Sequence, residues 1–218
     1  MFYSSYGSFM HRLIEGFYKG ELTKEQMLIK FLFDFQKEVR GDRPSESIVR
    51  KYISCGTEYL KRFSPLPYRM IDVERRLYFT VDQYQFVGVL DYVGEKDGKI
   101  FIVDNKSRDM KPRSGRKTPT QKDMELDDML RQLYLYAAAI KESFGAYPAA
   151  LCFNCFKSGV FIEEPFSETA FQKTVDWARR TIEAIQNETD FPPYPDYFVC
   201  RYLCGVRDEC CYAEGSDV

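Results

Sequence analysis

Long apolar runs are absent from this sequence, and no stretch approaches the about 18 residues that a membrane-spanning helix needs. The first residues, Met1 to Ser4, do not begin a basic region followed by an apolar core, as a secretion leader does. Net charge is also small, because 31 Lys and Arg stand against 33 Asp and Glu. We therefore expect a cytoplasmic protein with no membrane partner, whose binding to any polyanion would require a local basic patch.

The sequence contains one histidine, His11, and one tryptophan, Trp177. It has no internal repeat and no low-complexity segment. Cysteine is better represented, with seven residues, four of them crowded between Cys200 and Cys211. An odd number in this arrangement fits a metal or cluster site better than a secreted disulfide framework.

The length suits one α/β domain over residues 1–218. We expect a helical N-terminal part over residues 1–68, a core over residues 69–190 and a cysteine-rich tail over residues 191–218.

Helical periodicity dominates the first third. Ser4 and Ser5 are candidate caps for a helix over residues 7–20. Thr23 and Gln26 form a capping-box pattern that opens a second helix, from about Lys24 to Val39. The predicted buried face of that helix consists of Leu28, Phe31, Leu32 and Phe35.

From Ile71 the pattern changes to that of strands, so a mixed α/β sandwich follows the helical third. Asp97-Gly98 joins two apolar runs and predicts a tight hairpin. The further predicted elements are a helix over 45–62, strands over 71–80, 87–94, 99–106, 149–156 and 160–166, a helix from about 123 to 145, and an amphipathic helix over 168–187.

The hairpin carries the residues with the clearest chemistry. Asp91 ends the apolar run of its first strand, and Asp104-Asn105-Lys106 ends that of the second. Carboxylates brought together in this way suit a hard cation such as Mg²⁺ or Mn²⁺, which prefers oxygen ligands. Asp104 and Lys106 are two apart and should share one face of the strand, while Asn105 could offer its backbone carbonyl.

These residues resemble the D…(D/E)-x-K signature of the PD-(D/E)XK nuclease superfamily. Gly7 to His11 resembles the G-x-x-x-H helix of its RecB-like branch, and Gln132 to Tyr136 resembles the Q-x-x-x-Y motif of that branch. The resemblance implies a restriction-endonuclease-like mixed sheet flanked by helices. It also implies that His11, Asp91, Asp104 and the Asn105 carbonyl hold the metal, that Lys106 positions the water, and that Gln132 and Tyr136 hold the substrate strand.

Plainer interpretations stay open for several of these residues. A lone histidine such as His11 is more often a capped or core residue, and Gln132 and Tyr136 could be ordinary helix-surface residues. Glu74, one strand earlier, could line the site or could pair with a neighbouring arginine.

A basic loop follows Lys106 and is a candidate contact for the DNA backbone. Its residues for that role are Arg108, Lys111, Arg113, Arg116 and Lys117.

The tail resembles the ligand cluster of iron–sulfur members of the branch, such as AddAB-type and CRISPR-associated nucleases. That resemblance implies a [4Fe-4S] cluster, and thiolates at such spacings also suit zinc. In those relatives one ligand precedes the histidine helix, and here that stretch is MFYSSY. Three explanations stay open: the chain is shorter than its relatives at that end, Cys55 or Cys211 completes the set, or the cluster is lost. The candidate ligands are Cys200, Cys204, Cys210 and Cys211.

The resemblance thus predicts a metal-dependent DNA nuclease, of exonuclease type, that hydrolyses phosphodiesters in DNA processing, recombination or repair. A helicase or recombination protein would be a separate partner, because no helicase motif lies in these 218 residues. The alternatives are a catalytically inactive DNA-binding or structural module of the same fold, and a metal-dependent phosphohydrolase acting on nucleotides.

Overall fold

A five-stranded mixed sheet forms the centre of the molecule in the computed structural model, which describes residues 1–41, 43–193 and 196–212. The strands lie in the order β1-β2-β3-β4-β5, and β3 and β4 are parallel while the other neighbours are antiparallel. Their bounds are β1 Arg69–Val81, β2 Tyr84–Lys96, β3 Lys99–Lys106, β4 Ala150–Cys155 and β5 Val160–Pro165.

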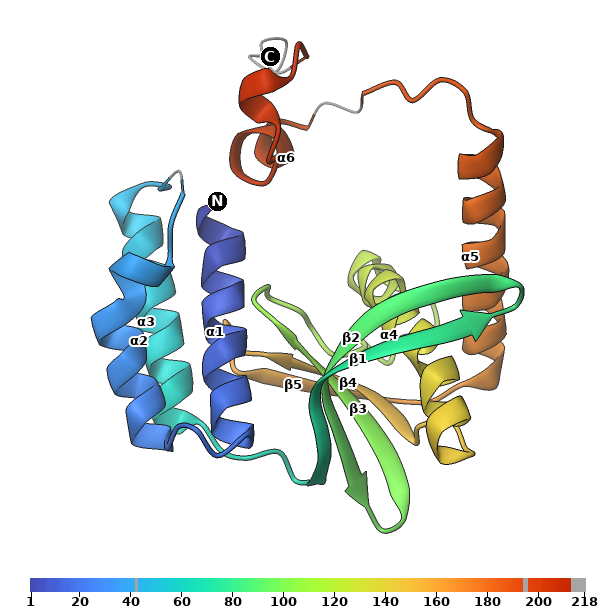
Figure 1. Ribbon diagram of the computed structural model, residues 1–218, viewed down its shortest axis with the longest axis horizontal. Helices are drawn as coiled ribbons and strands as arrows, with labels where there is room; N and C mark the ends of the chain where they lie inside the picture. Colours follow the sequence, from blue (N-terminus) through green and yellow to red (C-terminus); the bar gives the residue numbers. More distant parts are fainter. Residues whose placement is uncertain (42, 194–195, 213–218) are drawn as a thin grey trace.

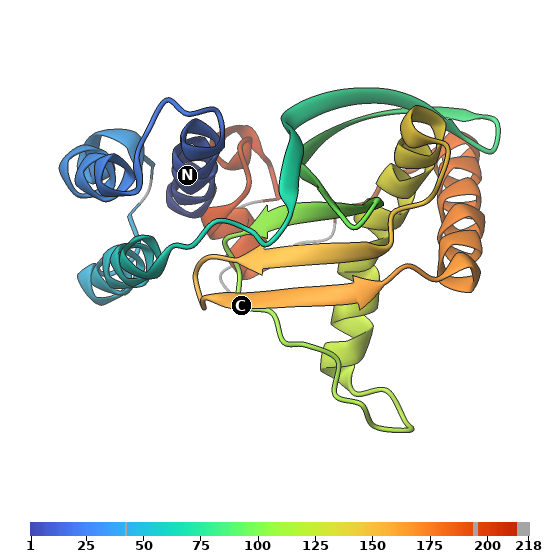
Figure 2. The same cartoon turned by 90° about the horizontal axis from the view of Figure 1, so that it is seen from below.

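Helices lie on both sides of this sheet (Figures 1 and 2). Three form an aromatic-rich group on one side: α1 Phe2–Tyr18, α2 Lys24–Glu38 and α3 Glu46–Arg62. On the other side α4 Gln121–Phe144 packs on the sheet, and α5 Glu168–Asn187 packs against α4. The fold is therefore the expected restriction-endonuclease-like α/β sandwich with a helical N-terminal third.

The described tail contains α6 Tyr197–Tyr202 and a single turn of 3₁₀-helix over Arg207–Glu209. It lies near the start of α1 (Figure 1). The rings of Phe198 and Tyr3 are 5.6 Å apart, and a Cβ built on Gly205 would lie 3.3 Å from the Met1 side chain. The two ends of the described chain therefore meet. Within the described ranges, no helix is long and apolar enough to cross a membrane.

Local signals account for most boundaries. The Thr23 and Gln26 capping box opens α2 as predicted, and Asp97 and Gly98 form the hairpin turn with φ values of 53° and 74°. These left-handed values are those that a primed turn requires.

Two expectations about the helices were wrong. Helix α1 begins at Phe2 with Met1 as its N-cap, so Ser4 and Ser5 lie within its first turn, where their hydroxyls donate to the Met1 carbonyl. In α2 the side chain of Leu32 is exposed. The helix packs through a narrower stripe, consisting of Met27, Phe31 and Phe35.

Candidate active site

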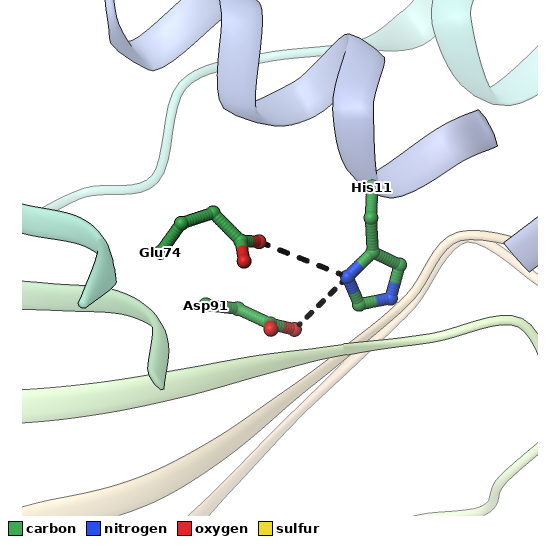
Figure 3. A group of neighbouring side chains, drawn as sticks. All are labelled: His11, Glu74 and Asp91. Atoms are coloured by element: carbon green, nitrogen blue, oxygen red, sulfur yellow. Dashed lines mark ion pairs between the residues drawn. The ribbon is translucent and has the colours of Figure 1, made fainter. Parts of the chain in front are cut away.

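Three side chains from three elements converge where α1 meets the hairpin of β1 and β2 (Figure 3). The Nδ1 atom of His11 lies 3.4 Å from Oδ2 of Asp91 and 4.0 Å from Oε1 of Glu74. One ligand atom from each of the three residues lies within 4.8 Å of the other two. We call His11, Glu74 and Asp91 the acidic group.

Asp91 is held in place by the neighbouring strand. It is buried, and its Oδ2 accepts a hydrogen bond of 2.6 Å from the backbone N–H of Asn105 in β3. The same oxygen faces His11, so the carboxylate is oriented from both sides.

Glu74 reaches the acidic group through an unusual backbone conformation. Its φ is 52°, in the left-handed region that non-glycine residues seldom adopt within strands. Val73 pairs with Tyr92 and Arg75 with Leu90, which places Glu74 opposite Asp91 across the hairpin. Strain of this kind concentrates at functional sites.

A second set of polar side chains lies beside the acidic group and ends on α4. The Nζ atom of Lys106 lies 2.7 Å from Oδ2 of Asp104, so these two residues share one face of β3 as their spacing predicts. Lys106 also donates a 3.0 Å hydrogen bond to Oε1 of Gln132. The amide of Gln132 in turn donates to the hydroxyl of Tyr136 at 3.1 Å.

Tyr136 is buried rather than on the helix surface. Its ring lies against Gly88 of β2, where an added Cβ would come within 2.2 Å of the ring. Glycine at this position therefore makes room for the ring that orients Gln132.

The carboxylates have unusual proton affinities. Burial and the charge of Asp91 raise the pKa of Glu74 to about 7. Burial raises the pKa of Asp104 to about 6, against the opposing charge of Lys106. For His11, burial lowers the pKa, but its hydrogen bond and charge interaction with Asp91 outweigh that effect and raise it above the ordinary value. A cation bound among these groups would take the place of protons.

The residues present fit a divalent cation. The acidic group combines two carboxylates with an imidazole, and a further buried carboxylate, that of Asp104, faces the Lys106 ammonium at 2.7 Å. Asp104 was predicted as a metal ligand, but the three residues whose ligand atoms lie within 4.8 Å of one another do not include it. Carboxylate oxygens and an imidazole are both ligands that divalent cations accept in proteins.

Comparison with known proteins identifies the family. A profile of the PD-(D/E)XK nuclease superfamily matches residues 2–211. The chain belongs to this superfamily. Membership supports nuclease activity.

Two solved structures similar to this PD-(D/E)XK protein have low sequence identity to it. One, described as a "Putative exonuclease" from Eubacterium rectale, is 11% identical, with a TM-score of 0.46 over 94% of this chain and 74% of that one. Another, SSO0001, is 15% identical, with a TM-score of 0.35 over 83% of this chain and 81% of that one. No curated protein matches the sequence.

In this PD-(D/E)XK protein, ion pairs and hydrogen bonds hold the centre of the basic loop after β3 against α4 and β5. Arg113 forms ion pairs with Asp127 at 2.7 Å and with Glu164 at 3.0 Å, and the hydrogen bond to Asp127 raises the pKa of its guanidinium. Asp123 accepts four hydrogen bonds, from the backbone N–H and hydroxyl groups of Ser114 and Thr120. Arg113 thus has a structural function in the loop.

The other predicted contacts in the loop are exposed, and within the described ranges no ion pair involves them: Arg108, Lys111, Arg116 and Lys117.

The tail thiols are all free. Cys211 is exposed, and Cys200, Cys204 and Cys210 are partly exposed. Among the described residues, they do not form a group of three ligand atoms within reach of one another.

Sequence reasoning gave Glu74 no more than a possible place at the site, and it missed Asn154 altogether. Asn154 lies beside Asn105 on β4 and donates to its side-chain oxygen at 2.7 Å. For Glu74 the only signal was a carboxylate in the strand before the hairpin. For Asn154 the signal was a polar residue inside the otherwise apolar run ALCFNCF.

Proposed function

We propose that this chain is a deoxyribonuclease of the RecB-like branch that hydrolyses DNA phosphodiesters with Mg²⁺ or Mn²⁺. The observation that carries the proposal is the convergence of His11, Glu74 and Asp91 beside the Asp104 and Lys106 pair, 2.7 Å apart. Metal ligands next to an ammonium group are what a protein needs to bind a cation and to hydrolyse a phosphodiester with it.

Each residue has a separate task in this proposal. His11, Asp91 and Asp104, with Glu74 and the Asn105 carbonyl, hold the cation. When bound, the cation polarises the phosphate and lowers the pKa of the attacking water. Lys106 positions that water and stabilises the negative charge that develops on the phosphate oxygens. The water oxygen bonds to phosphorus, the bond to one ester oxygen breaks, and that oxygen leaves with a proton.

Gln132 and Tyr136 support Lys106. The chain of hydrogen bonds from Tyr136 through Gln132 to the Lys106 Nζ atom fixes the direction of the ammonium. Gln132 is exposed beside Lys106, and we expect it to hold the substrate strand there. The exposed basic residues of the loop, Arg108, Lys111, Arg116 and Lys117, would contact the DNA backbone without reading its sequence.

Gel assays on linear and circular DNA test this proposal. The wild-type chain should degrade linear single- or double-stranded DNA with Mg²⁺ or Mn²⁺, and an exonuclease should spare circular DNA. Asp104→Ala and Lys106→Ala should abolish cleavage. Lys99→Ala, at the exposed start of the same strand, is the matched control and should cut normally.

Three results would contradict the proposal in different ways. A wild-type chain that binds DNA but cuts none would indicate an inactive module. Hydrolysis of free nucleotides alone would indicate a phosphohydrolase. Equal cleavage by Asp104→Ala would remove the assigned site. End-labelled DNA would give the polarity, and co-purification would identify a helicase or recombination partner for DNA processing or repair.

The tail carries a separate proposal. We propose that Cys200, Cys204, Cys210 and Cys211 bind a [4Fe-4S] cluster or zinc that fastens the tail to the start of α1. The contact between Phe198 and Tyr3 supports this placement, since their rings lie 5.6 Å apart. Iron, sulfide and zinc analysis of anaerobically purified protein distinguishes the two metals, and a metal-free tail in folded, active protein would refute both.

A further inference from the structure

Asn154 of β4 makes two hydrogen bonds that lead toward the acidic group. Its Nδ2 donates to Oδ1 of Asn105 at 2.7 Å and to the hydroxyl of Tyr59 at 2.7 Å. Asn105 and Asn154 are direct neighbours in the parallel register of β3 and β4. One amide group thus joins helix α3 to the strand that carries Asp104 and Lys106.

The two amides bond to one another in a largely buried part of the sheet. Asn105 is buried, and Val103 and Cys152, which lie two residues earlier on the same face of β3 and β4, are buried and apolar. A buried amide without partners destabilises a fold, whereas two apolar side chains at paired positions are often neutral or better. The hydrogen bond between the two amides offsets the cost of burying them, and it also has a geometric consequence.

That consequence is the direction of the Asn105 peptide. Its N–H donates to Oδ2 of Asp91 at 2.6 Å, and the same Asp91 oxygen lies 3.4 Å from His11. Fixing the Asn105 side chain through Asn154 limits rotation of its backbone. The hydrogen bond that the Asn154 amide donates to the Tyr59 hydroxyl in turn fixes which way that amide points.

We propose that Asn154 is a positioning residue for the metal-binding acidic group, and that Tyr59 orients it. The effect passes from Tyr59 through Asn154 and Asn105 to Asp91. The inference rests on the proposed function only in that the acidic group binds a divalent cation.

The position of Asn154 allows it to be truncated without a closed void. Tyr59 and Asn154 line a cavity of about 530 Å³ between the C-terminal half of α3, the segment 63–67 and the turn joining β4 to β5. Removing the amide therefore extends an existing space that is open to water, so Asn154→Ala should fold.

Titration of the full chain with Mn²⁺ alone, followed by electron paramagnetic resonance and calorimetry, tests the inference. Replacing a residue that supports a metal ligand commonly weakens metal affinity by about 10–100-fold, and we expect Asn154→Ala to fall in that range. Tyr59→Phe keeps the ring and should weaken binding by less. Tyr52→Phe, on the same helix with its hydroxyl outside the Asn154 network, should bind as the wild type does. Circular dichroism and thermal unfolding establish that each variant is folded at the titration temperature.

Unchanged Mn²⁺ affinity in folded Asn154→Ala would overturn the inference, as would equal weakening by Tyr59→Phe and Tyr52→Phe. Failure of the proposed function looks different. If the wild type binds Mn²⁺ and Asn154→Ala binds it weakly, but neither cuts DNA, the inference stands and the nuclease assignment falls. If the wild type cuts DNA and all variants bind Mn²⁺ equally, the nuclease assignment stands and the inference about Asn154 falls.

Discussion

Glu74 should lower the stability of the metal-free fold because of both its backbone and its charge. A left-handed φ costs a non-glycine residue about 1 kcal/mol or more, and Glu74 has a φ of 52°. Its carboxyl pKa rises from 4.5 to about 7 through burial and the charge of Asp91. At 1.36 kcal/mol per pKa unit this amounts to about 3 kcal/mol, which we reduce to about 1–2 kcal/mol because water reaches part of the side chain.

The variants Glu74→Gln and Glu74→Gly separate the two contributions. Because the folded-state pKa is raised, the carboxyl favours folding below pH 4.5 and that contribution is lost as pH rises to about 7. Without metal, Glu74→Gln should therefore match the wild type near pH 4 and exceed its stability by about 1–2 kcal/mol at pH 8. Glu74→Gly should also be more stable at pH 4, because glycine tolerates the left-handed φ, although its unfolded chain gains about 0.5–1 kcal/mol of entropy.

Mn²⁺ should reverse this order. A cation at 100 times its Kd stabilises a folded chain by about 2.7 kcal/mol, and the wild type should gain more than either variant. Urea unfolding at several pH values, with and without Mn²⁺, measures these differences, and DNA cleavage by both variants should fall.

Asp82→Gly is the matched control. Asp82 has a φ of 57° in the turn between β1 and β2 and lies outside the acidic group. It should relieve backbone strain and leave Mn²⁺ binding unchanged. If Glu74→Gln gains no stability between pH 4 and pH 8, or if Mn²⁺ stabilises it as much as the wild type, the reasoning about Glu74 is wrong.

Three further predictions follow from contacts in and beside the site. Gly88→Ala should cost about 1–3 kcal/mol because the new Cβ would meet the Tyr136 ring at 2.2 Å, and adding Tyr136→Leu should restore stability in urea unfolding without restoring cleavage. Asp123→Ala should speed trypsin cleavage of the exposed basic loop at pH 7, because the hydrogen bonds that order Ser114 and Thr120 are lost; in the wild type those bonds lower the pKa of Asp123, so they persist at neutral pH. Mn²⁺ affinity should rise from about pH 5 to pH 8, because Glu74 and Asp104 retain protons to about pH 7 and 6, and calorimetry in buffers of different ionisation enthalpy should detect their release.

The sequence by itself determined the elements and one half of the site. The capping box at Thr23 and the turn at Asp97-Gly98 specify local backbone geometry within a few residues, so they could be identified without a fold. The alternation along β3 placed Asp104 and Lys106 on one face for the same reason.

Tertiary structure alone decided the rest. Glu74 joins His11 and Asp91 because of the register of β1 against β2 and a left-handed φ that no local pattern encodes. Arg113 became a structural anchor because α4 and β5 bring Asp127 and Glu164 to it. Spacing along one segment fixes which side chains share a face, whereas contacts between segments depend on register and packing, which the whole chain sets together.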